Sequence, residues 1–351
     1  MDEVWSERDT TPAKIEAALR NIVIEHHHSD HPFVPARVLN VVVVVDGQFR
    51  GEIENRFERV GRYHPSRLVL CAVEDGRQTI DAWAGVGTDD AEPRPGHIAV
   101  ARERVELDIG PRHLAKLDTI VDPLLVSDLA TMVWAPHGHD EAVDSLRRLA
   151  QIVLVDTQDE PDVGESLDRA AELGKHAYVV DLAWLRSTPW RERVAATFDP
   201  PHLRPDLRTI SAVTVRHHPE SAVAGLLLMG WLASRLDWRF SPLVARNGSL
   251  VGSAHARRQD VRLTLEPATD LQVRGLAGVT LETASGRHFD LDRGPGGLHA
   301  YYRNAKGDER RWVVLGASRG ESGILGEGIR QALVRDPTYA PALQAAWAAV
   351  G

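Results

Sequence analysis

The segment "RVLNVVVVVDG" constrains the fold of this chain more than any other stretch. Its consecutive valines form a continuous β-branched run that ends in Asp-Gly, a common turn pair. A run that is apolar at odd and even positions alike predicts a strand buried on both faces. Strands of this kind occur in parallel sheets covered by helices, so we expect an α/β architecture.

Strand-like and helix-like segments alternate through the first two hundred residues. Further buried strands are predicted at "RLVLCAV", "ATMVWAP", "QIVLVDT" and "AYVVD". Helices are predicted at "TTPAKIEAALRNI", "GEIENRFERVGRY", "HLAKLDTIVDPLL", "DEAVDSLRRLA", "VGESLDRAAELG" and "PWRERVAATF". "TIDAWAG" and "HIAVARERVELDI" alternate as edge or antiparallel strands do. We therefore predict a first domain over residues 1–200, with a mostly parallel sheet and helices on both faces.

The stretch "DPPHLRPDLR" is rich in proline and lacks periodicity, so we place a domain boundary there. A long apolar helix follows in "PESAVAGLLLMGWLASRLDW". Short segments separated by turn residues come next and predict an antiparallel meander, and two amphipathic helices close the chain. Residues 201–351 are thus expected to form an α+β domain with an antiparallel sheet and C-terminal helices.

Charge and hydropathy exclude several classes of partner. The formal net charge of −9 argues against nucleic acid, since phosphate binding needs an excess of Lys and Arg. The longest apolar run, "AVAGLLLMGWLA", is shorter than the roughly 20 residues that span a bilayer. The acidic N-terminal segment has no apolar signal core, so we expect a cytoplasmic protein that binds neither nucleic acid nor membrane. A single cysteine, Cys71, excludes an internal disulfide.

Motifs for catalysis, cofactors and metals are incomplete. "GASRG" matches a nucleophile elbow around Ser318, but such hydrolases need a histidine later in the chain, and the last one is His299. No glycine-rich phosphate loop follows a strand, so we expect no nucleotide cofactor. His27 and His31 in "EHHHSDH" have metal-ligand spacing, but the following proline and the lack of apolar periodicity indicate a solvated loop. We expect neither a catalytic centre nor a metal site.

Three acidic residues follow apolar runs, namely Asp46, Asp156 and Asp181. Ligand sites of α/β proteins often lie outside the carboxyl ends of the strands. Aspartate is also a common residue for leaving a strand and starting a turn. With no matching histidine or lysine, the turn interpretation is favoured.

The segment "VVDLAWLRSTPWRERVAATF" combines capping signals with interface-type residues. Thr188 as N-cap and Pro189 at the first helical position predict a helix start, and Trp190, Val194 and Phe198 form its apolar stripe. These roles leave Trp184, Arg186 and Arg191 unexplained. Trp and Arg are enriched at the energetic centres of protein interfaces, so core packing and partner contact both remain open for them.

This segment resembles the signature of the bacterial glucose-6-phosphate dehydrogenase assembly protein family, OpcA. "GRYHPSRLVLCAV", "DTIVDPLLVSDLATMVWAPHG", "AGLLLMGWLASRLDW" and "RGESGILGEGIRQALVRDPTYAPAL" are similar to other stretches of that family, in the same order. The resemblance covers nearly the whole chain. It implies a non-catalytic partner that binds glucose-6-phosphate dehydrogenase and favours its active oligomer in the oxidative pentose phosphate pathway.

If that resemblance holds, the partner surface is expected at Trp184, Arg186 and Arg191, with His64 and Arg67 as further candidates. Asp181, Thr188, Pro189 and Trp190 would hold the segment in shape. Replacing Trp184 and Arg186 by alanine should then abolish activation of the dehydrogenase while leaving thermal stability nearly unchanged. The alternative is a small-molecule enzyme or sugar-phosphate sensor that uses Asp156, Asp181 and Arg186 at the carboxyl edge of the first sheet.

Overall fold

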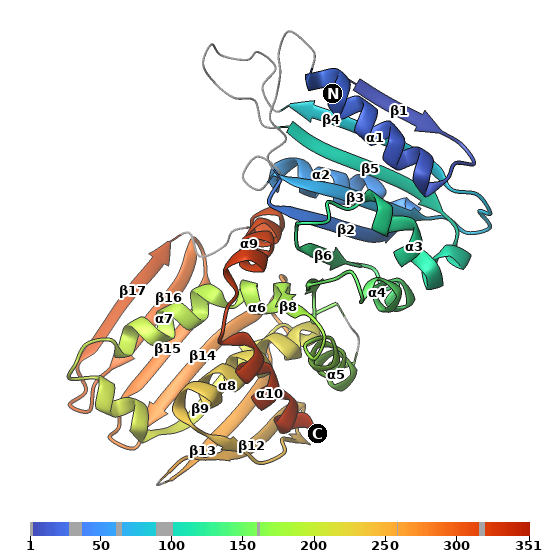
Figure 1. Cartoon of the computed structure of the whole chain (residues 1–351). Coiled ribbons are helices and arrows are strands. Elements are labelled where there is room, and N and C mark those ends of the chain that lie inside the picture. The colour runs from blue at the N-terminus through green and yellow to red at the C-terminus, as the bar shows by residue number, and fades with distance from the viewer. Residues whose placement is uncertain are drawn as a thin grey trace, which may run out of the picture. The chain divides into compact units, whose positions relative to one another are not determined.

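A computed structural model describes residues 3–27, 37–60, 65–88, 101–159, 162–257, 259–315 and 320–351 (Figure 1). The chain forms two compact units, each of which is interrupted in sequence. The first unit comprises Met1–Val155, His176–Val180 and Glu321–Val334. The second comprises Asp156–Lys175, Asp181–Gly320 and Arg335–Gly351.

The first unit is built on a mostly parallel sheet, as the valine run predicts. β2 pairs in parallel with β3 and β6, β3 with β5, and β6 with β7, whereas β4 is antiparallel to β5 and β1. In sheet order the strands are β1 (Glu3–Glu7), β4 (Asp81–Thr88), β5 (Ala101–Ile109), β3 (Ser66–Val73), β2 (Leu39–Asp46), β6 (Thr131–Trp134), β7 (Ile152–Val155) and β8 (Tyr178–Asp181).

Helices bury the central strands of this sheet. The valines of β2 from Val41 to Val45 are fully buried, which requires cover on both faces. Ile15, Leu19 and Ile22 form the expected buried stripe of the first helix, which packs on β4. The helices of the unit are α1 (Pro12–His27), α2 (Arg50–Val60), α3 (Leu117–Val121), α4 (Asp140–Leu146) and α9 (Gly320–Val334).

Cys71 lies at the centre of β3 and is completely buried. Burial raises the pKa of its thiol to about 12, because the apolar core disfavours the thiolate. The thiolate is the reactive form of cysteine, so this thiol is chemically inert in the folded protein.

The second unit contains a mixed sheet, which confirms the α+β expectation. β14 (Leu276–Thr283), β15 (His288–Gly294), β16 (Gly297–Arg303) and β17 (Glu309–Leu315) form the predicted antiparallel meander. The central strand, β9 (Ile210–His217), was not predicted from the sequence. It pairs in parallel with β13 (Asp260–Pro267) and antiparallel with β14. β10 (Arg239–Phe240), β11 (Val244–Arg246) and β12 (Ser249–His255) complete the sheet.

Long helices pack on one face of this second sheet. Alternate residues of β9, β13 and β14 are buried, and α8 contacts β9 and β13. The helices are α5 (Val163–Leu173), α6 (Leu182–Arg186), α7 (Thr188–Phe198), α8 (Ala222–Leu236) and α10 (Tyr339–Val350). In the described part of the chain, no helix is long and apolar enough to cross a membrane.

Two expectations about chain organisation differ from the structure. A single boundary near residue 200 does not match the observed units, because α5 to α7 belong to the second unit and α9 to the first. The helix expected at residues 113–125 is broken into three pieces. Lys116 has a non-helical conformation, and Pro123 follows the short α3.

Gly230 in α8 allows α8 and α10 to approach closely. A Cβ atom at this position would lie 2.2 Å from the carbonyl oxygen of Ala342. We expect Gly230→Ala to lower the free energy of unfolding by about 1–3 kcal/mol, because backbone atoms of α10 must move. Gly51→Ala in α2 is the matched control: its Cβ meets nothing within 4 Å, so it should stabilise slightly. Urea unfolding of both variants tests this, and equal stabilities would contradict it.

Candidate functional site

Residues 179–198, which we call the Trp-flanked segment, include the end of β8 and then fold as two short helices. Asp181 caps α6, because its Oδ1 accepts a hydrogen bond from Ala183 N at 2.9 Å. Ser187 separates α6 from α7 and occupies the N-cap position, so Thr188 is the first helical residue rather than the expected N-cap. The apolar stripe of α7, which begins with Trp190, is buried as predicted. Local sequence therefore determines where the two helices begin.

Trp184 is a core residue, with 2% of its surface exposed. Its Nε1 donates a hydrogen bond to Asp336 Oδ2 at 2.9 Å. Its ring meets Tyr339 edge-on at a centroid distance of 5.6 Å, and the guanidinium of Arg191 lies 3.4 Å from the ring centroid. Trp184 thus joins α6 to the chain segment that begins α10.

Arg191 is also buried, with 8% of its surface exposed. It donates to Thr188 Oγ1 at 2.9 Å, to Ser187 Oγ at 3.2 Å and to the Trp184 carbonyl at 3.2 Å. Burial lowers the pKa of its guanidinium to about 10, although the nearby Asp336 carboxylate opposes this.

Asp336 completes this network from the opposite side. Burial alone would raise the pKa of its carboxyl group, but the hydrogen bonds from Thr338 and Trp184 and the charge of Arg191 together hold it below the ordinary value. Thr338 supplies two of these bonds, from N at 2.8 Å and from Oγ1 at 2.6 Å. The ionised form is therefore the stable one in the folded unit.

Asp156 and Arg186 form a bidentate ion pair beside this network, with N–O distances of 2.8 and 2.6 Å. Asp181 is 1% exposed and accepts from Thr157 Oγ1 at 2.8 Å and from the Tyr339 hydroxyl at 3.0 Å. Burial, followed by the charge of Asp156, raises the pKa of Asp181 to about 6. Asp156, Asp181 and Arg186, the residues of the sugar-phosphate alternative, therefore already form ion pairs or hydrogen bonds with other side chains of this protein.

Several expectations about a partner surface need correction. Trp184 and Arg191 are not exposed, so their side chains do not present a contact surface in the folded unit. Arg67 donates to Glu103 Oε2 at 2.6 Å and to the Leu124 carbonyl at 2.8 Å, and thus compensates a buried carboxylate. His64 lies outside the described residues. Arg186 retains a partly exposed side chain, at 21%.

The other chemical motifs lie largely outside the described residues. These include Ser318 and residues 28–36, among them His31, for which a solvated loop was expected. Asp46, at the end of β2, lies 3.0 Å from Nε2 of His139. Within the described ranges, no group of three or more His, Cys, Asp or Glu side chains could hold a metal ion.

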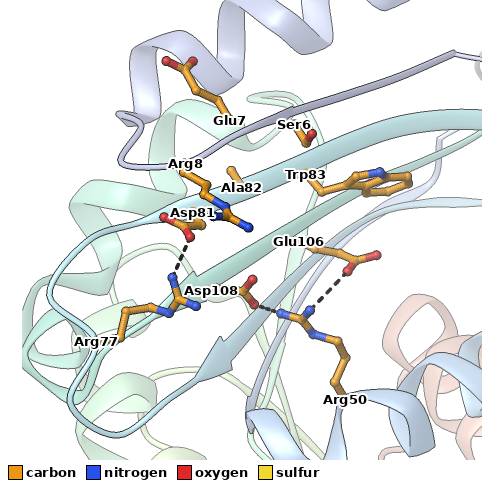
Figure 2. A pocket seen from close by; sticks show the side chains of 10 residues that line it. All are labelled: Ser6, Glu7, Arg8, Arg50, Arg77, Asp81, Ala82, Trp83, Glu106 and Asp108. Carbon is orange, nitrogen blue, oxygen red and sulfur yellow. Dashed lines mark hydrogen bonds and ion pairs between the residues drawn. The ribbon is translucent and has the colours of Figure 1, made fainter.

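A charged hollow in the first unit was not predicted from the sequence. It has a volume of about 580 Å³ and opens on β4 and β5 (Figure 2). Strand register brings its residues together, since Asp81 pairs with Asp108, and Trp83 with Glu106 and Ser6. The lining residues are Ser6, Glu7, Arg8, Arg50, Arg77, Asp81, Ala82, Trp83, Glu106 and Asp108.

Ion pairs fix most charges of the charged hollow. Arg50 pairs with Asp108, and Arg77 with Asp81 at 2.7 Å (Figure 2). Burial raises the pKa of Glu106, and the neighbouring arginines Arg104 and Arg50 partly offset the effect. Much of the charge that lines this hollow is therefore already compensated within the protein.

The Trp83 ring covers the sheet at one side of this hollow. It lies directly over Gly85, where a Cβ atom would come within 2.5 Å of Cη2. The sequence did not predict the short strand β1. Asp81 and Asp108, two acids of the hollow, become neighbours only because β4 pairs with β5. The sequence signal of the hollow is therefore weak.

The architecture defines a protein of two units, one α/β and one α+β. Its Trp-flanked segment is held by a buried polar network around Trp184, Arg191 and Asp336. Residues 58–172 match the model of the glucose-6-phosphate dehydrogenase subunit N-terminal domain, and residues 177–343 that of the C-terminal domain. Together these matches cover well over half of the sequence. The chain belongs to the OpcA family, as the sequence resemblance indicated.

Similar curated proteins carry the name OxPP cycle protein OpcA. The relative from Synechococcus elongatus is 26% identical over 51% of this chain and 41% of its own length. The relative from Nostoc punctiforme is 32% identical over 36% of this chain and 28% of its own length. The chain thus spans less than half the length of these relatives.

Solved dehydrogenase structures show distant similarity. The WlbA dehydrogenase from Thermus thermophilus is 14% identical, with a TM-score of 0.43 over 88% of this chain and 93% of that chain. The scyllo-inositol dehydrogenase from Lactobacillus casei is 10% identical, with a TM-score of 0.46 over 90% and 96%. Similarity at this level supports no conclusion about activity.

The expectation that replacing Trp184 leaves thermal stability nearly unchanged is wrong, because the burial of this side chain predicts a large effect on stability. We expect Trp184→Ala to lower the free energy of unfolding by about 3–5 kcal/mol, because it leaves a cavity and removes a donor from Asp336. Trp184→Phe keeps most of the ring and should cost less. Trp312→Ala, at a Trp of the same unit that is 40% exposed, is the matched control with a smaller loss. Equal losses at Trp184 and Trp312 in urea unfolding would contradict the core assignment.

The raised pKa of Asp181 predicts a pH-dependent stability. Its folded pKa of about 6 lies above the ordinary value of 3.8, so the folded state binds the proton more tightly between these values. Its contribution to stability therefore falls as pH rises through this window. Asp181→Asn removes the charge and keeps a capping oxygen, so it should gain on the order of 1–3 kcal/mol relative to wild type between pH 4 and pH 7.

Asp336→Asn provides a control of opposite sign. The pKa of Asp336 is lowered in the folded state, so its stabilising contribution is present at neutral pH and is lost in acid. Urea unfolding at pH 7 and pH 4.5 measures the Asp181 difference, and a further measurement at about pH 3 is needed for Asp336, whose contribution is lost only below its ordinary pKa of 3.8. A stability difference between Asp181→Asn and wild type that does not change with pH would contradict the raised pKa.

Proposed function

We propose that this protein is a non-catalytic partner of a glucose-6-phosphate dehydrogenase in the oxidative pentose phosphate cycle. The observation that carries this proposal is the match of both family models, which describe glucose-6-phosphate dehydrogenase subunit domains, to most of the chain. The names of the OpcA relatives agree with a role in this cycle. The engagement of Asp156, Asp181 and Arg186 within the protein also favours binding over chemistry at these residues.

The proposed mechanism is a shift in the assembly equilibrium of the dehydrogenase. A protein that binds the active oligomer more tightly than the inactive form increases the active population by its differential affinity. A shift of about 100-fold requires only about 2.7 kcal/mol of preference. Such a preference is well within the energy of a modest protein interface.

Arg186 is the residue of the Trp-flanked segment that we propose for direct contact. Its side chain is partly exposed, and the ion pair with Asp156 holds its guanidinium in one orientation. Trp184, Thr188, Pro189, Trp190 and Arg191 would then act by holding α6 and α7 in place, together with the cap at Asp181.

The proposal predicts that the protein activates the dehydrogenase of the same organism. Titration should raise the rate or the substrate affinity, and light scattering should show a larger complex at the same concentrations. No complex and no change in rate would contradict the proposal.

Arg186→Ala should weaken this activation, and because it also leaves the Asp156 carboxylate without its ion pair, the free energy of unfolding of the variant is measured beside its activation. Arg193→Ala, at an exposed arginine of α7, is the matched control. If both variants activate as wild type does, Arg186 does not contact the dehydrogenase. The proposed function would still stand, with the contact at other residues.

A further inference from the structure

β1 is the last strand at one edge of the first sheet. It pairs antiparallel with β4 on one side, from Glu3 opposite Val86 to Glu7 opposite Ala82. Within the described part of the chain no strand pairs with its other side. Because a β-strand directs hydrogen-bonding groups to both sides, alternate N–H and C=O groups of β1 face this open edge. An open edge of this kind can accept an additional strand.

A hollow of about 540 Å³ lies beside β1 where the strand meets α1. We call it the helix-side hollow. Ala17 and Ala18 have small side chains, which leave space next to Ile22 and Trp5. Val4 at its rim is 59% exposed. The remaining lining residues are Glu7, Lys14, Asn21 and Glu25. This hollow therefore offers apolar surface to a side chain that comes from the edge.

The charged hollow lies beside the same strand and includes Ser6 and Arg8 (Figure 2). Successive residues of a strand point to opposite faces, so Ser6 and Trp5 face different sides of the sheet. Arg8 is exposed and forms no ion pair with the described residues, in contrast to Arg50 and Arg77. Its charge is thus available to an acidic side chain.

We propose that β1 is the docking edge for an extended segment of the dehydrogenase partner, which adds to the sheet as a further strand. This inference rests on the proposed function and specifies its surface. The side chains of an added strand alternate between the two faces. One face of the segment would carry an apolar side chain for the helix-side hollow, and the other an acidic side chain for Arg8. Main-chain hydrogen bonds between β1 and the added strand supply affinity. The two hollows determine which side chains the partner segment can carry.

Filling the helix-side hollow tests the proposal. Ala17 is exposed, so Ala17→Trp should fold normally and yet occupy the space required by the incoming side chain. We expect it to raise the Kd for the dehydrogenase by on the order of tenfold or more. Ala13→Trp, at an exposed alanine of α1 that does not line the hollow, should bind as wild type does. Arg8→Glu should also weaken binding, with Arg147→Glu at another exposed arginine as its control.

Hydrogen exchange gives an independent measurement of strand addition. Amides in the peptide that spans residues 3–8 should exchange more slowly in the complex with wild-type protein. A wild-type complex with unchanged exchange there, or with Ala17→Trp binding at full affinity, would overturn the docking edge and leave the proposed function standing. Absence of any wild-type complex would overturn the proposed function and this inference with it.

Discussion

The hydrogen bond from Trp184 Nε1 to Asp336 Oδ2 connects two segments that lie 152 positions apart in the sequence. Around it, Arg191 covers the indole ring, Tyr339 meets the ring edge, and Thr338 holds the carboxylate. Each polar group has a partner, which is the condition under which a buried charge is tolerated. The path of α6 and α7 and the start of α10 depend on this arrangement.

This network changes the meaning of the family signature. Trp and Arg in a short segment are typical of interfaces, yet here they satisfy one another inside the second unit. The Trp184 and Arg191 side chains of this signature stabilise the positions of α6 and α7 and are not exposed for contact with a partner. The contacts proposed for a partner, at Arg186 and at the β1 edge, lie outside this buried group of side chains.

The two edges of the first sheet differ. β8 ends at the cap of α6, so the chain continues directly into a helix. β1 ends the same sheet on the opposite side with two hollows beside it. An open edge is a hazard for aggregation unless it is short, charged or covered. β1 is short and ends at the charged Glu7, and both features limit non-specific pairing at this edge.

The sequence by itself determined the parallel sheet, the antiparallel meander and most helices, because apolar periodicity reports burial along a single element. It also determined the start of α7 near Pro189, which is a local property of the backbone. Only the tertiary structure decided that Trp184 and Arg191 are buried, since their partner Asp336 is remote in sequence. The same holds for β9 and for the hollows beside β1. These features arise from pairing between distant segments, and no local pattern specifies which segments meet.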